Sequence, residues 1–375
     1  MKKVIAYFKK DVMLGVAVLA ALVSLFITPP SKALLSDIDW KTLGTLFMLL
    51  LVLEGFKSEN LFLPVINLAR KMKTQRMLSF FLVFGVFFSS MFVTNDVSLI
   101  IFVPLTIILF RAGDKERYIL PVIVLENIAA VRGSLLTPFG SPQNLFLFSQ
   151  SGIAVPDFLR MMLPLWLGSI VLLSVFLCFV YRKDSREKIV IEKSVTSAWD
   201  PAKRGNRILY LTLFLAVVVS ILTRTKLWPY LTLAVALLVL IFDRSAYKRV
   251  DFALIVTFLC FFIFASSIAA NAAIADFLKR SVSGHEYLWS IALSQIISNV
   301  PASIVLWPFT EELKPLIYGL DTAGLVTVIG SLASVINLRI YTKEYPGNGL
   351  KFMAAFEKID LIFFAIVFPL QLLLI

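Results

Sequence analysis

The stretch that decides the fold is residues 77–110, which read MLSFFLVFGVFFSSMFVTNDVSLIIFVPLTIILF. As a single helix it would be about 51 Å long at about 1.5 Å per residue, whereas the hydrocarbon core of a bilayer is about 30 Å thick. The polar run Thr94-Asn95-Asp96 interrupts its middle. The sequence therefore predicts that this segment breaks at the polar run and returns as a re-entrant hairpin.

The composition of the whole chain indicates a membrane protein. Apolar residues make up 59% of the 375 residues, charged residues make up 16%, and the net charge is +12. A soluble chain carries about 25% charged residues, so the soluble enzyme classes are excluded. We predict an all-α polytopic membrane protein, because the alternating segments of about ten residues that form a membrane barrel are absent. The other apolar segments are 12–28, 42–56, 118–150, 157–181, 208–223, 227–242, 252–270, 287–310, 315–338 and 357–375.

The basic residues indicate the orientation of the chain. Lys and Arg are concentrated in one alternating set of loops, of which 182–207 is the most basic. Short cytoplasmic loops retain cations, so we expect the N-terminus inside and the C-terminus outside, in the cytoplasmic (inner) membrane of a bacterium. Segment 287–310 could cross the membrane straight, but the cations of 339–358 would then lie outside. The charge bias therefore favours a second re-entrant hairpin, broken at Ser298-Asn299-Val300-Pro301.

The order of segments repeats within the chain. Residues 38–76 and 250–282 each hold an apolar span followed by a basic amphipathic stretch. Each is followed by a broken segment with Asn at the break, and then by a segment interrupted by glycine: GSLLTPFGSPQNLFLF at 133–148 and AGLVTVIGSLASVINL at 323–338. With the intervening spans, the second unit runs in the opposite direction to the first. Inverted repeats with paired broken helices are typical of secondary transporters.

The repeat divides the chain into four parts. These are an N-terminal helix that is retained rather than cleaved as a signal peptide, two repeat units, and between them a basic cytoplasmic loop with two linking spans. In chain order the parts are 1–37; 38–181, with hairpin 77–110, broken helix 118–150 and span 157–181; 182–249; and 250–375, with hairpin 287–310, broken helix 315–340 and a last span.

The motifs TNDVSLIIFVPLTII, GSPQNL, SNVPASIVL and TVIGSLASVINL, in this order, resemble the ion transporter superfamily of divalent anion:sodium symporters, arsenite permeases and sodium/proton antiporters. The resemblance covers about 38–375. It implies an elevator-like displacement of a hairpin-bearing domain against a scaffold, roughly 12–76 and 208–282, and a homodimer formed through that scaffold. In the dicarboxylate and sulfate symporters both hairpin tips resemble Ser-Asn-Thr. Here both third-position threonines are missing, which argues against dicarboxylate recognition and favours a smaller solute with proton coupling.

The breaks are expected to meet at a polar pocket near the bilayer midplane. Non-helical backbone at that depth must be buried in protein or line a wet cavity, because each unpaired polar group costs several kcal/mol in lipid. Asn95 and Asn299 would cap the second hairpin arms, whose N-terminal dipoles favour an anion. Carbonyls around Thr137–Gln143 and Thr327–Ser334, with serine hydroxyls, are hard oxygen ligands suited to Na⁺. Alternatively, these polar residues only hold helices together.

Three ionisable residues within the apolar segments are candidates for function. Asp96 at the first tip lies deep in the hydrocarbon, where a charge costs at least ~2.5 kcal/mol, so we expect it to be protonatable or cation-bound. Arg132, just before the interrupted segment, could neutralise an anionic substrate. The alternative for Arg132 is an ion pair with Glu126 or with Asp96. Glu54 is expected at the membrane interface.

These residues together predict a secondary active transporter of a small inorganic or carboxylate anion, working by alternating access and coupled to Na⁺ or H⁺. Sodium/proton antiport, with Asp96 carrying the exchanged ion, and arsenite efflux are the alternatives. An intramembrane enzyme is not expected, because His285 is solitary and a nucleophile with a base is missing. The expected partners are the anion and membrane lipid, without nucleic acid, and the coupling ion is the one expected cofactor. The candidate substrate-binding residues are Thr94, Asn95, Asp96, Arg132, Ser141, Asn144, Ser298, Asn299, Ser331 and Ser334, and the candidate Na⁺ ligands are Asn95, Thr137, Gly140, Ser141, Asn299, Gly330 and Ser331.

Overall fold

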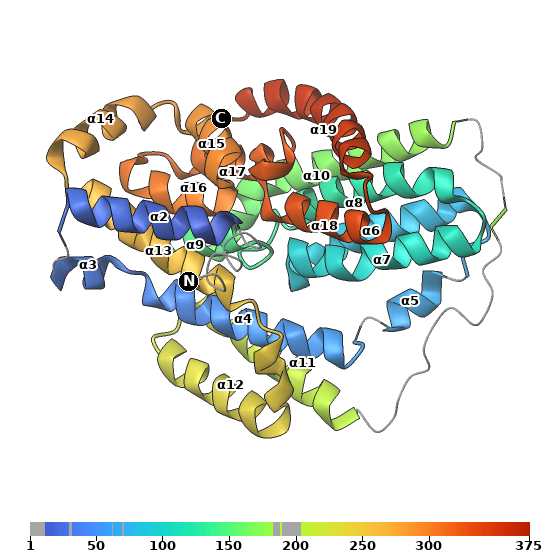
Figure 1. The fold of residues 1–375 in the computed structure, drawn as a ribbon, viewed down its shortest axis with the longest axis horizontal. Helices are drawn as coiled ribbons and strands as arrows, with labels where there is room; N and C mark the ends of the chain where they lie inside the picture. The colour runs from blue at the N-terminus through green and yellow to red at the C-terminus, as the bar shows by residue number, and fades with distance from the viewer. Residues whose placement is uncertain (1–11, 30–31, 62, 70, 183–187, 190–203) are drawn as a thin grey trace.

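The computed structural model describes residues 12–29, 32–61, 63–69, 71–182, 188–189 and 204–375, and these residues form helices joined by loops (Figure 1). Five of the described helices are long and apolar enough to cross a membrane by length and composition, namely Gln75–Val93, Asn95–Ala112, Val155–Val180, Gly205–Thr223 and Phe252–Ala269. The prediction of an all-α polytopic membrane protein is confirmed. Residues 1–11 and most of the basic stretch 182–207, which carry the argument for orientation, lie outside the described residues.

The two predicted repeat units contain helices in the same order. In the first unit they are α4 (Trp40–Ser58), α5 (Leu63–Ala69), α6 (Gln75–Val93), α7 (Asn95–Ala112), α8 (Ile119–Gly133), α9 (Pro142–Ser151) and α10 (Val155–Val180). In the second they are α13 (Phe252–Ala269), α14 (Ala272–Val282), α15 (Glu286–Ile297), α16 (Asn299–Leu306), α17 (Leu313–Ala323), α18 (Leu332–Glu344) and α19 (Gly349–Leu372). Outside the units lie α2 (Val12–Ile27), α3 (Lys32–Asp37), α11 (Arg204–Thr223) and α12 (Trp228–Phe242).

Short 3₁₀ helices complete the connections. They are η1 (Glu116–Tyr118) before α8, η4 (Arg244–Lys248) before α13, η5 (Trp307–Phe309) after α16 and η6 (Val328–Gly330) between α17 and α18. Helix η6 lies between α17 and α18. This connection corresponds to the unwound connection between α8 and α9 in the first unit. Both broken helices of the repeat are therefore interrupted at the same place in their units.

The correspondence of the two units extends to single backbone angles. At the hairpin tips, Thr94 has φ 72° and ψ 156°, and Ser298 has φ 70° and ψ 157°. Before the second halves of the broken helices, Ser141 has φ −146° and ψ 152°, and Ser331 has φ −144° and ψ 139°. Two chain segments with unrelated side chains thus adopt one backbone design at the positions where the helices break.

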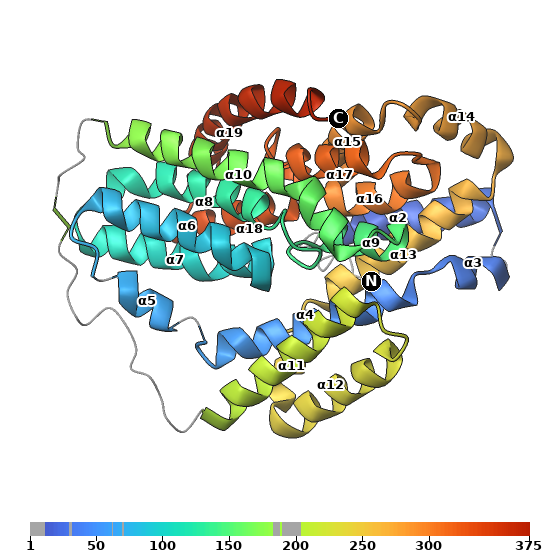
Figure 2. The same ribbon diagram turned by 180° about the vertical axis from the view of Figure 1, so that it is seen from behind.

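The hairpins lie in opposite halves of the molecule along its long axis. Figures 1 and 2 show α6 and α7 in one half and α15 and α16 in the other. Within each unit the hairpin packs closely on the first half of the broken helix, α6 on α8 and α15 on α17. Helices α11 and α12 pack on α4, and α2 packs on α13. The hairpins and broken helices are therefore held between helices that do not themselves break.

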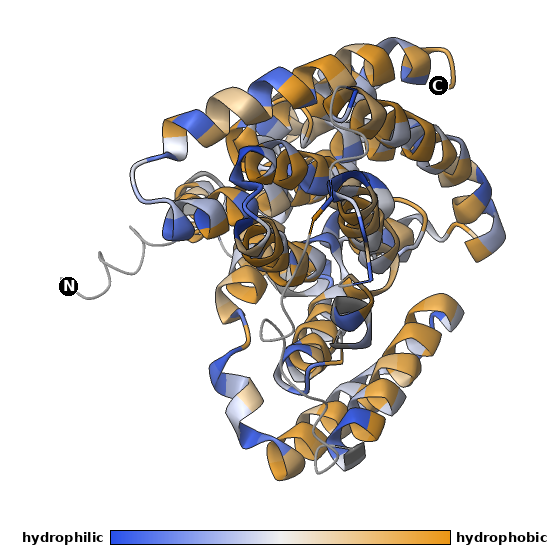
Figure 3. Ribbon diagram, turned by 90° about the vertical axis from the view of Figure 1, so that its right-hand side faces the viewer, coloured by the Kyte–Doolittle hydropathy of each residue, from blue (hydrophilic) through white to orange (hydrophobic). Residues whose placement is uncertain are grey.

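The outer helices present apolar side chains to their surroundings. Figure 3 shows hydrophobic residues along most of the helices, with hydrophilic residues concentrated near their ends and in the loops. On α10, Leu167, Val171, Val175 and Phe179 are exposed at intervals of four residues, which places them on one face of the helix. Such a face is costly in water and stable in lipid. The outer surface of the helices is therefore apolar, as the composition of the chain predicts for a protein surrounded by lipid.

Candidate functional site

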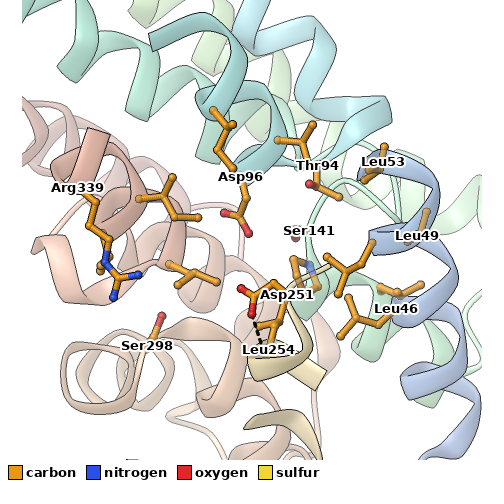
Figure 4. Close-up of a pocket in the computed structure, with 18 of the residues that line it drawn as sticks. Leu46, Leu49, Leu53, Thr94, Asp96, Ser141, Asp251, Leu254, Ser298 and Arg339 are labelled. Atoms are coloured by element: carbon orange, nitrogen blue, oxygen red, sulfur yellow. Dashed lines mark hydrogen bonds between the residues drawn. The ribbon is translucent and has the colours of Figure 1, made fainter. Parts of the chain in front are cut away.

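A cavity of about 500 Å³ lies where the two hairpin tips and the first unwound segment come together (Figure 4). Thr94 from the first tip, Ser298 from the second and Ser141 from the stretch between α8 and α9 line it. The remaining wall is largely apolar and comes from α2, α4, α7, α9, α13, α15, α18 and α19, and from Val328 and Ile329 between α17 and α18. The cavity thus collects polar groups at the breaks and encloses them with side chains from helices of both units.

Both hairpin tips are held in a backbone conformation that is normally confined to glycine. The positive φ angles of Thr94 and Ser298, combined with extended ψ, lie in a region that costs about 1–3 kcal/mol for a residue with a Cβ atom. Strain of this kind persists where the surrounding structure determines the backbone, and it clusters at functional sites. Two strained residues that line the same cavity therefore mark this cavity as the candidate site.

Two carboxylates from different helices enter the cavity. Figure 4 shows Asp96 on α7 and Asp251 at the start of α13 on facing walls. Asp251 Oδ1 accepts a hydrogen bond from the Leu254 amide at 3.2 Å and so caps α13. Asp96 Oδ1 is buried, and no hydrogen-bond donor reaches it from the described residues. A buried carboxylate oxygen without a donor is suited to a proton or a cation.

The basic side chains on the lining are Lys57 of α4 and Arg339 of α18. Lys57 forms a salt bridge with Glu54, one turn earlier on the same helix, and Glu54 also lines the cavity. Arg339 is exposed and lies at the mouth. Neither Lys57 nor Arg339 was predicted from the sequence to be a site residue. The helical spacing of Leu332, Val335, Ile336 and Arg339 could have identified the second, because positions three and four apart share one helix face.

The first hairpin tip is joined to the first unwound segment by direct contacts. The Asn95 amide donates to the Gly140 carbonyl at 3.2 Å, and Thr137 Oγ1 donates to the Met91 carbonyl at 2.5 Å. A Cβ atom at Gly140 would overlap the Ser134 carbonyl oxygen, so only glycine allows the chain to fold back this closely. Ser141 Oγ is buried without a partner among the described residues. The Ser141 hydroxyl is therefore available to bind a ligand in the cavity.

The second tip is held differently. Asn299 donates from Nδ2 to the Leu320 carbonyl on α17 at 3.2 Å. Gln295 Nε2 donates to the Ala323 carbonyl at 3.1 Å, and Thr327 Oγ1 donates to Gln295 Oε1 at 2.7 Å. The expected capping role is therefore wrong for Asn299, whose side chain reaches a neighbouring helix. Asn95 does not occupy the N-cap position either, because it is the first helical residue of α7. Within the described part of the chain, its Oδ1 accepts a hydrogen bond only from the next amide, that of Asp96.

Arg132 lies in a buried network away from the lining of the cavity. It is 1% exposed, and Nε donates to Ser169 Oγ at 2.9 Å. Nη1 approaches Thr322 Oγ1 at 3.4 Å and the Asp321 carbonyl at 3.5 Å, and the Asp321 carboxylate interacts electrostatically with the guanidinium. The expected alternative, an ion pair with Glu126 or Asp96, is not formed within the described residues. Arg132 instead joins the first halves of the two broken helices.

The cavity brings together four of the candidate substrate residues, namely Thr94, Asp96, Ser141 and Ser298. The other candidates are buried elsewhere: Asn95, Arg132, Asn144, Asn299, Ser331 and Ser334. Of the candidate Na⁺ ligands only Ser141 lines the cavity, whereas Asn95, Thr137 and Gly140 lie directly behind it through the contacts above. In the described part of the chain, His, Cys, Asp and Glu do not gather in groups of three or more that could hold a metal ion.

Comparison with known proteins identifies a family and two related chains. A sequence model of the family described as Citrate transporter matches residues 4–336, a range that includes both hairpin tips and both unwound segments. The chain is 31% identical over 306 residues to an uncharacterized transporter of Methanocaldococcus jannaschii, and the match covers 81% of each chain. It is 30% identical over 344 residues to the inner membrane protein YbiR of Escherichia coli, covering 89% of this chain and 87% of that protein.

Proposed function

Since the chain belongs to the citrate transporter family, within the ion transporter superfamily, we propose that it is a secondary active transporter of a small carboxylate or inorganic anion, citrate and related acids first. It is an integral membrane transporter. In the proposed cycle, alternating access exposes the cavity to each side of the membrane in turn, and Na⁺ or H⁺ drives the anion. The family match and the location of the cavity support this proposal together.

The observation that carries the proposal is the meeting of both hairpin tips at one cavity. Each tip begins a helix, α7 or α16, whose N-terminal dipole favours an anion. The Asn95 and Asp96 amides of α7 are already bonded to Gly140 and Asn95, so the unbonded amides of the first turns would be the donors. The hydroxyl groups of Thr94, Ser141 and Ser298 add further donors on the lining. Lys57 and Arg339 would balance the charge of the anion, a role that the sequence suggested for Arg132.

Asp96 would carry the coupling. Its buried oxygen lies in the same cavity as the donors that would bind the anion, so a proton or Na⁺ on this carboxylate would remove the repulsion between the two. The carbonyl groups around Gly140 and Gly330 remain the proposed Na⁺ ligands at the unwound segments. An inner-membrane location, a cytoplasmic N-terminus, re-entrant hairpins, an elevator-like displacement and a homodimer belong to the same proposal.

One observation favours a second candidate, a cation/proton antiporter. Asp96 and Asp251 face each other across the cavity, and paired carboxylates bind cations more readily than anions. In that case Asp96 would carry the exchanged ion, and the lining cations would only moderate its affinity. The two functions differ in what Arg339 does, because an anion needs its charge and an exchanged cation does not.

The test is uptake into proteoliposomes that contain the purified full chain. Radiolabelled citrate, succinate, phosphate, sulfate and arsenite are each supplied with an inward Na⁺ gradient, an inward H⁺ gradient, or neither. We expect one anion class to accumulate only when a gradient is imposed. Arg339→Gln should reduce that uptake at least tenfold, whereas Arg339→Lys should retain most of it, because charge rather than shape is required at the mouth.

The matched control is Arg160→Gln, since Arg160 is an exposed arginine on α10 outside the cavity and its ion pair with Asp157 is exposed too. It should transport as the wild type does. If none of the anions accumulates while an imposed Na⁺ gradient moves protons, the antiporter is the correct reading. In that case Arg339→Gln should leave exchange intact and Asp96→Asn should abolish it.

A further inference from the structure

Helix α18 has a buried polar face, turned away from the cavity, which the proposed function does not use. Leu332, Val335 and Ile336 line the cavity, whereas Ser334 and Asn337 are fully buried on the side that contacts α8. Helices α7, α8 and α18 all pack on one another. The polar groups between these three helices therefore form a compartment of their own, separated from the cavity by the width of α18.

Two asparagines connect α8 and α18 inside this compartment. Asn127 of α8 donates from Nδ2 to Ser334 Oγ at 3.0 Å. Asn337 of α18 donates from Nδ2 to the Ile123 carbonyl at 3.0 Å. Both hydrogen bonds use the amide nitrogen, which leaves the two carboxamide oxygens, Asn127 Oδ1 and Asn337 Oδ1, available inside the protein.

A carboxylate lies on the same face of α8. Ile123, Glu126 and Asn127 are spaced at i, i+3 and i+4, so Asn337, which contacts Ile123, reaches α8 between the other two residues. Thr106 of α7 donates from Oγ1 to Glu126 Oε1 at 2.5 Å. The second oxygen, Glu126 Oε2, is not used by this bond. The spacing along α8 and the contact of Asn337 with Ile123 therefore put the carboxylate and the two carboxamides in one region between the three packed helices.

The compartment has too many acceptors for the donors around it. Glu126, Asn127 and Asn337 are each 0% exposed. Glu126 Oε2, Asn127 Oδ1 and Asn337 Oδ1 receive no hydrogen bond from the residues that the structure describes, and no basic side chain there pairs with Glu126. A water molecule has two donors and no charge. It would therefore leave one of the three oxygens without a donor and the carboxylate without a counter-charge. A cation satisfies all three at once.

We propose that Glu126, Asn127 and Asn337 form a binding site for one monovalent cation, Na⁺, enclosed between α7, α8 and α18. One carboxylate and two neutral carboxamides match a single positive charge, and all three ligands are the hard oxygens that alkali ions accept. The site is distinct from the unwound segments at which Na⁺ was expected. That this ion also drives transport rests on the proposed function, whereas its binding does not.

The experiment measures thermal unfolding of the detergent-solubilised full chain without any anion substrate. NaCl is titrated against choline chloride at constant ionic strength, and KCl is titrated in parallel. A ligand that binds only the folded state raises the unfolding temperature with its concentration. We expect a saturable rise with Na⁺ in the wild type and a rise at least several-fold smaller in Glu126→Gln and in Asn337→Leu, which keep the volume of the side chain and remove the charge or the oxygen; any Na⁺ held at the unwound segments would account for what remains.

The matched control is Ser290→Ala on α15, a buried serine outside both sites whose hydroxyl donates to the Glu286 carbonyl of its own helix, and it should retain the Na⁺ response. Because the core variants could lower stability by themselves, Asn337→Asp provides a second measurement. Its added carboxylate should make Ca²⁺ stabilise the protein when Ca²⁺ has no such effect on the wild type. The proposal is overturned if Na⁺ does not stabilise the wild type, or if the response is undiminished in Glu126→Gln and in Asn337→Leu. Neither result would bear on anion uptake.

Discussion

The two repeat units share a backbone but not its charges. The tips at Thr94 and Ser298, and the serines at 141 and 331, have nearly the same φ and ψ angles in both units. Yet the residue two positions beyond the tip is Asp96 in the first unit and Val300 in the second. The repeated backbone therefore builds the cavity, and the side chains of each unit give it a different chemistry.

Where one unit carries a buried charge, the other unit supplies its counterpart. Arg132 lies near the end of α8, and Asp321 lies near the end of α17, the corresponding helix of the second unit. Gln143, at the start of α9, donates to Asp321 Oδ1 at 2.9 Å and ties the acid to the first unit as well. The two units are therefore joined at their broken helices by buried hydrogen bonds, from Arg132 to Thr322 and from Gln143 to Asp321.

Removing Arg132 is the strongest way to break this relation between the units. Arg132→Met should lower the free energy of unfolding by about 3 kcal/mol, because it removes the buried hydrogen bonds to Ser169 and Thr322 and the nearest positive charge to the buried Asp321 carboxylate. Denaturant or thermal unfolding in detergent measures the loss. The double variant with Asp321→Leu should recover part of it, and strictly additive losses in the two single variants would contradict this link between the units.

The glycines of the unwound segments test whether the backbones are equivalent. Gly140→Ala and Gly330→Ala should each cost about 1–3 kcal/mol, because the new Cβ would overlap the carbonyl oxygen of Ser134 or Ala323. Gly168→Ala on α10 is the control, since a Cβ there meets nothing within 4 Å, and it should leave stability nearly unchanged. A large cost at one unwound segment only would show that the two are not equivalent.

The hairpin tips should respond to relief of strain. Thr94→Gly and Ser298→Gly should each raise the free energy of unfolding by about 1 kcal/mol, since glycine accepts the positive φ. Thr94→Ala and Ser298→Ala keep the Cβ and should give no gain. Anion uptake should fall in all four variants, because the hydroxyl is lost from the cavity in each. A gain in the alanine variants would show that the hydroxyl, and not the backbone, carries the strain.

The smallest effects are expected at the caps of α4 and α13. Asp39 and Asp251 hold corresponding positions, with φ −76° and ψ 80° and with φ −78° and ψ 80°. Replacing either by Ala should cost about 0.5–1 kcal/mol through loss of the cap. Transport should separate them, because only Asp251 lines the cavity, and equal uptake in both variants would remove it from the proposed site.

Sequence alone was sufficient for the class of fold and the breaks. The polar run at Thr94-Asn95-Asp96 and its partner at Ser298 stand out because apolar spans tolerate few such residues, and the Gly140-Ser141 and Gly330-Ser331 pairs mark the other two interruptions. These are local signals within one helix length. They identify which backbone leaves the helix, and in a bilayer such backbone has to be enclosed.

The contacts between distant segments were beyond such reasoning. Arg132 was expected to contact the substrate or to pair with Glu126 or Asp96, whereas the acid that lies near it in the structure, Asp321, is 189 residues away. Asp251 was not considered for the cavity, since it reads as an ordinary cap at the start of a span. Which face of a helix meets which neighbour depends on the packing of the whole unit, and single motifs do not encode it.

The two faces of α18 have a consequence for leak of ions across the membrane. One helix about 10 Å wide separates the cavity from the buried asparagine contacts. A helix rotates as a rod, so a turn of α18 that widens the cavity also draws Asn337 away from α8. We therefore expect that the substrate path cannot open while the asparagine contacts stay closed. Tight stoichiometry would then follow from a shared wall, with no relay of residues in between.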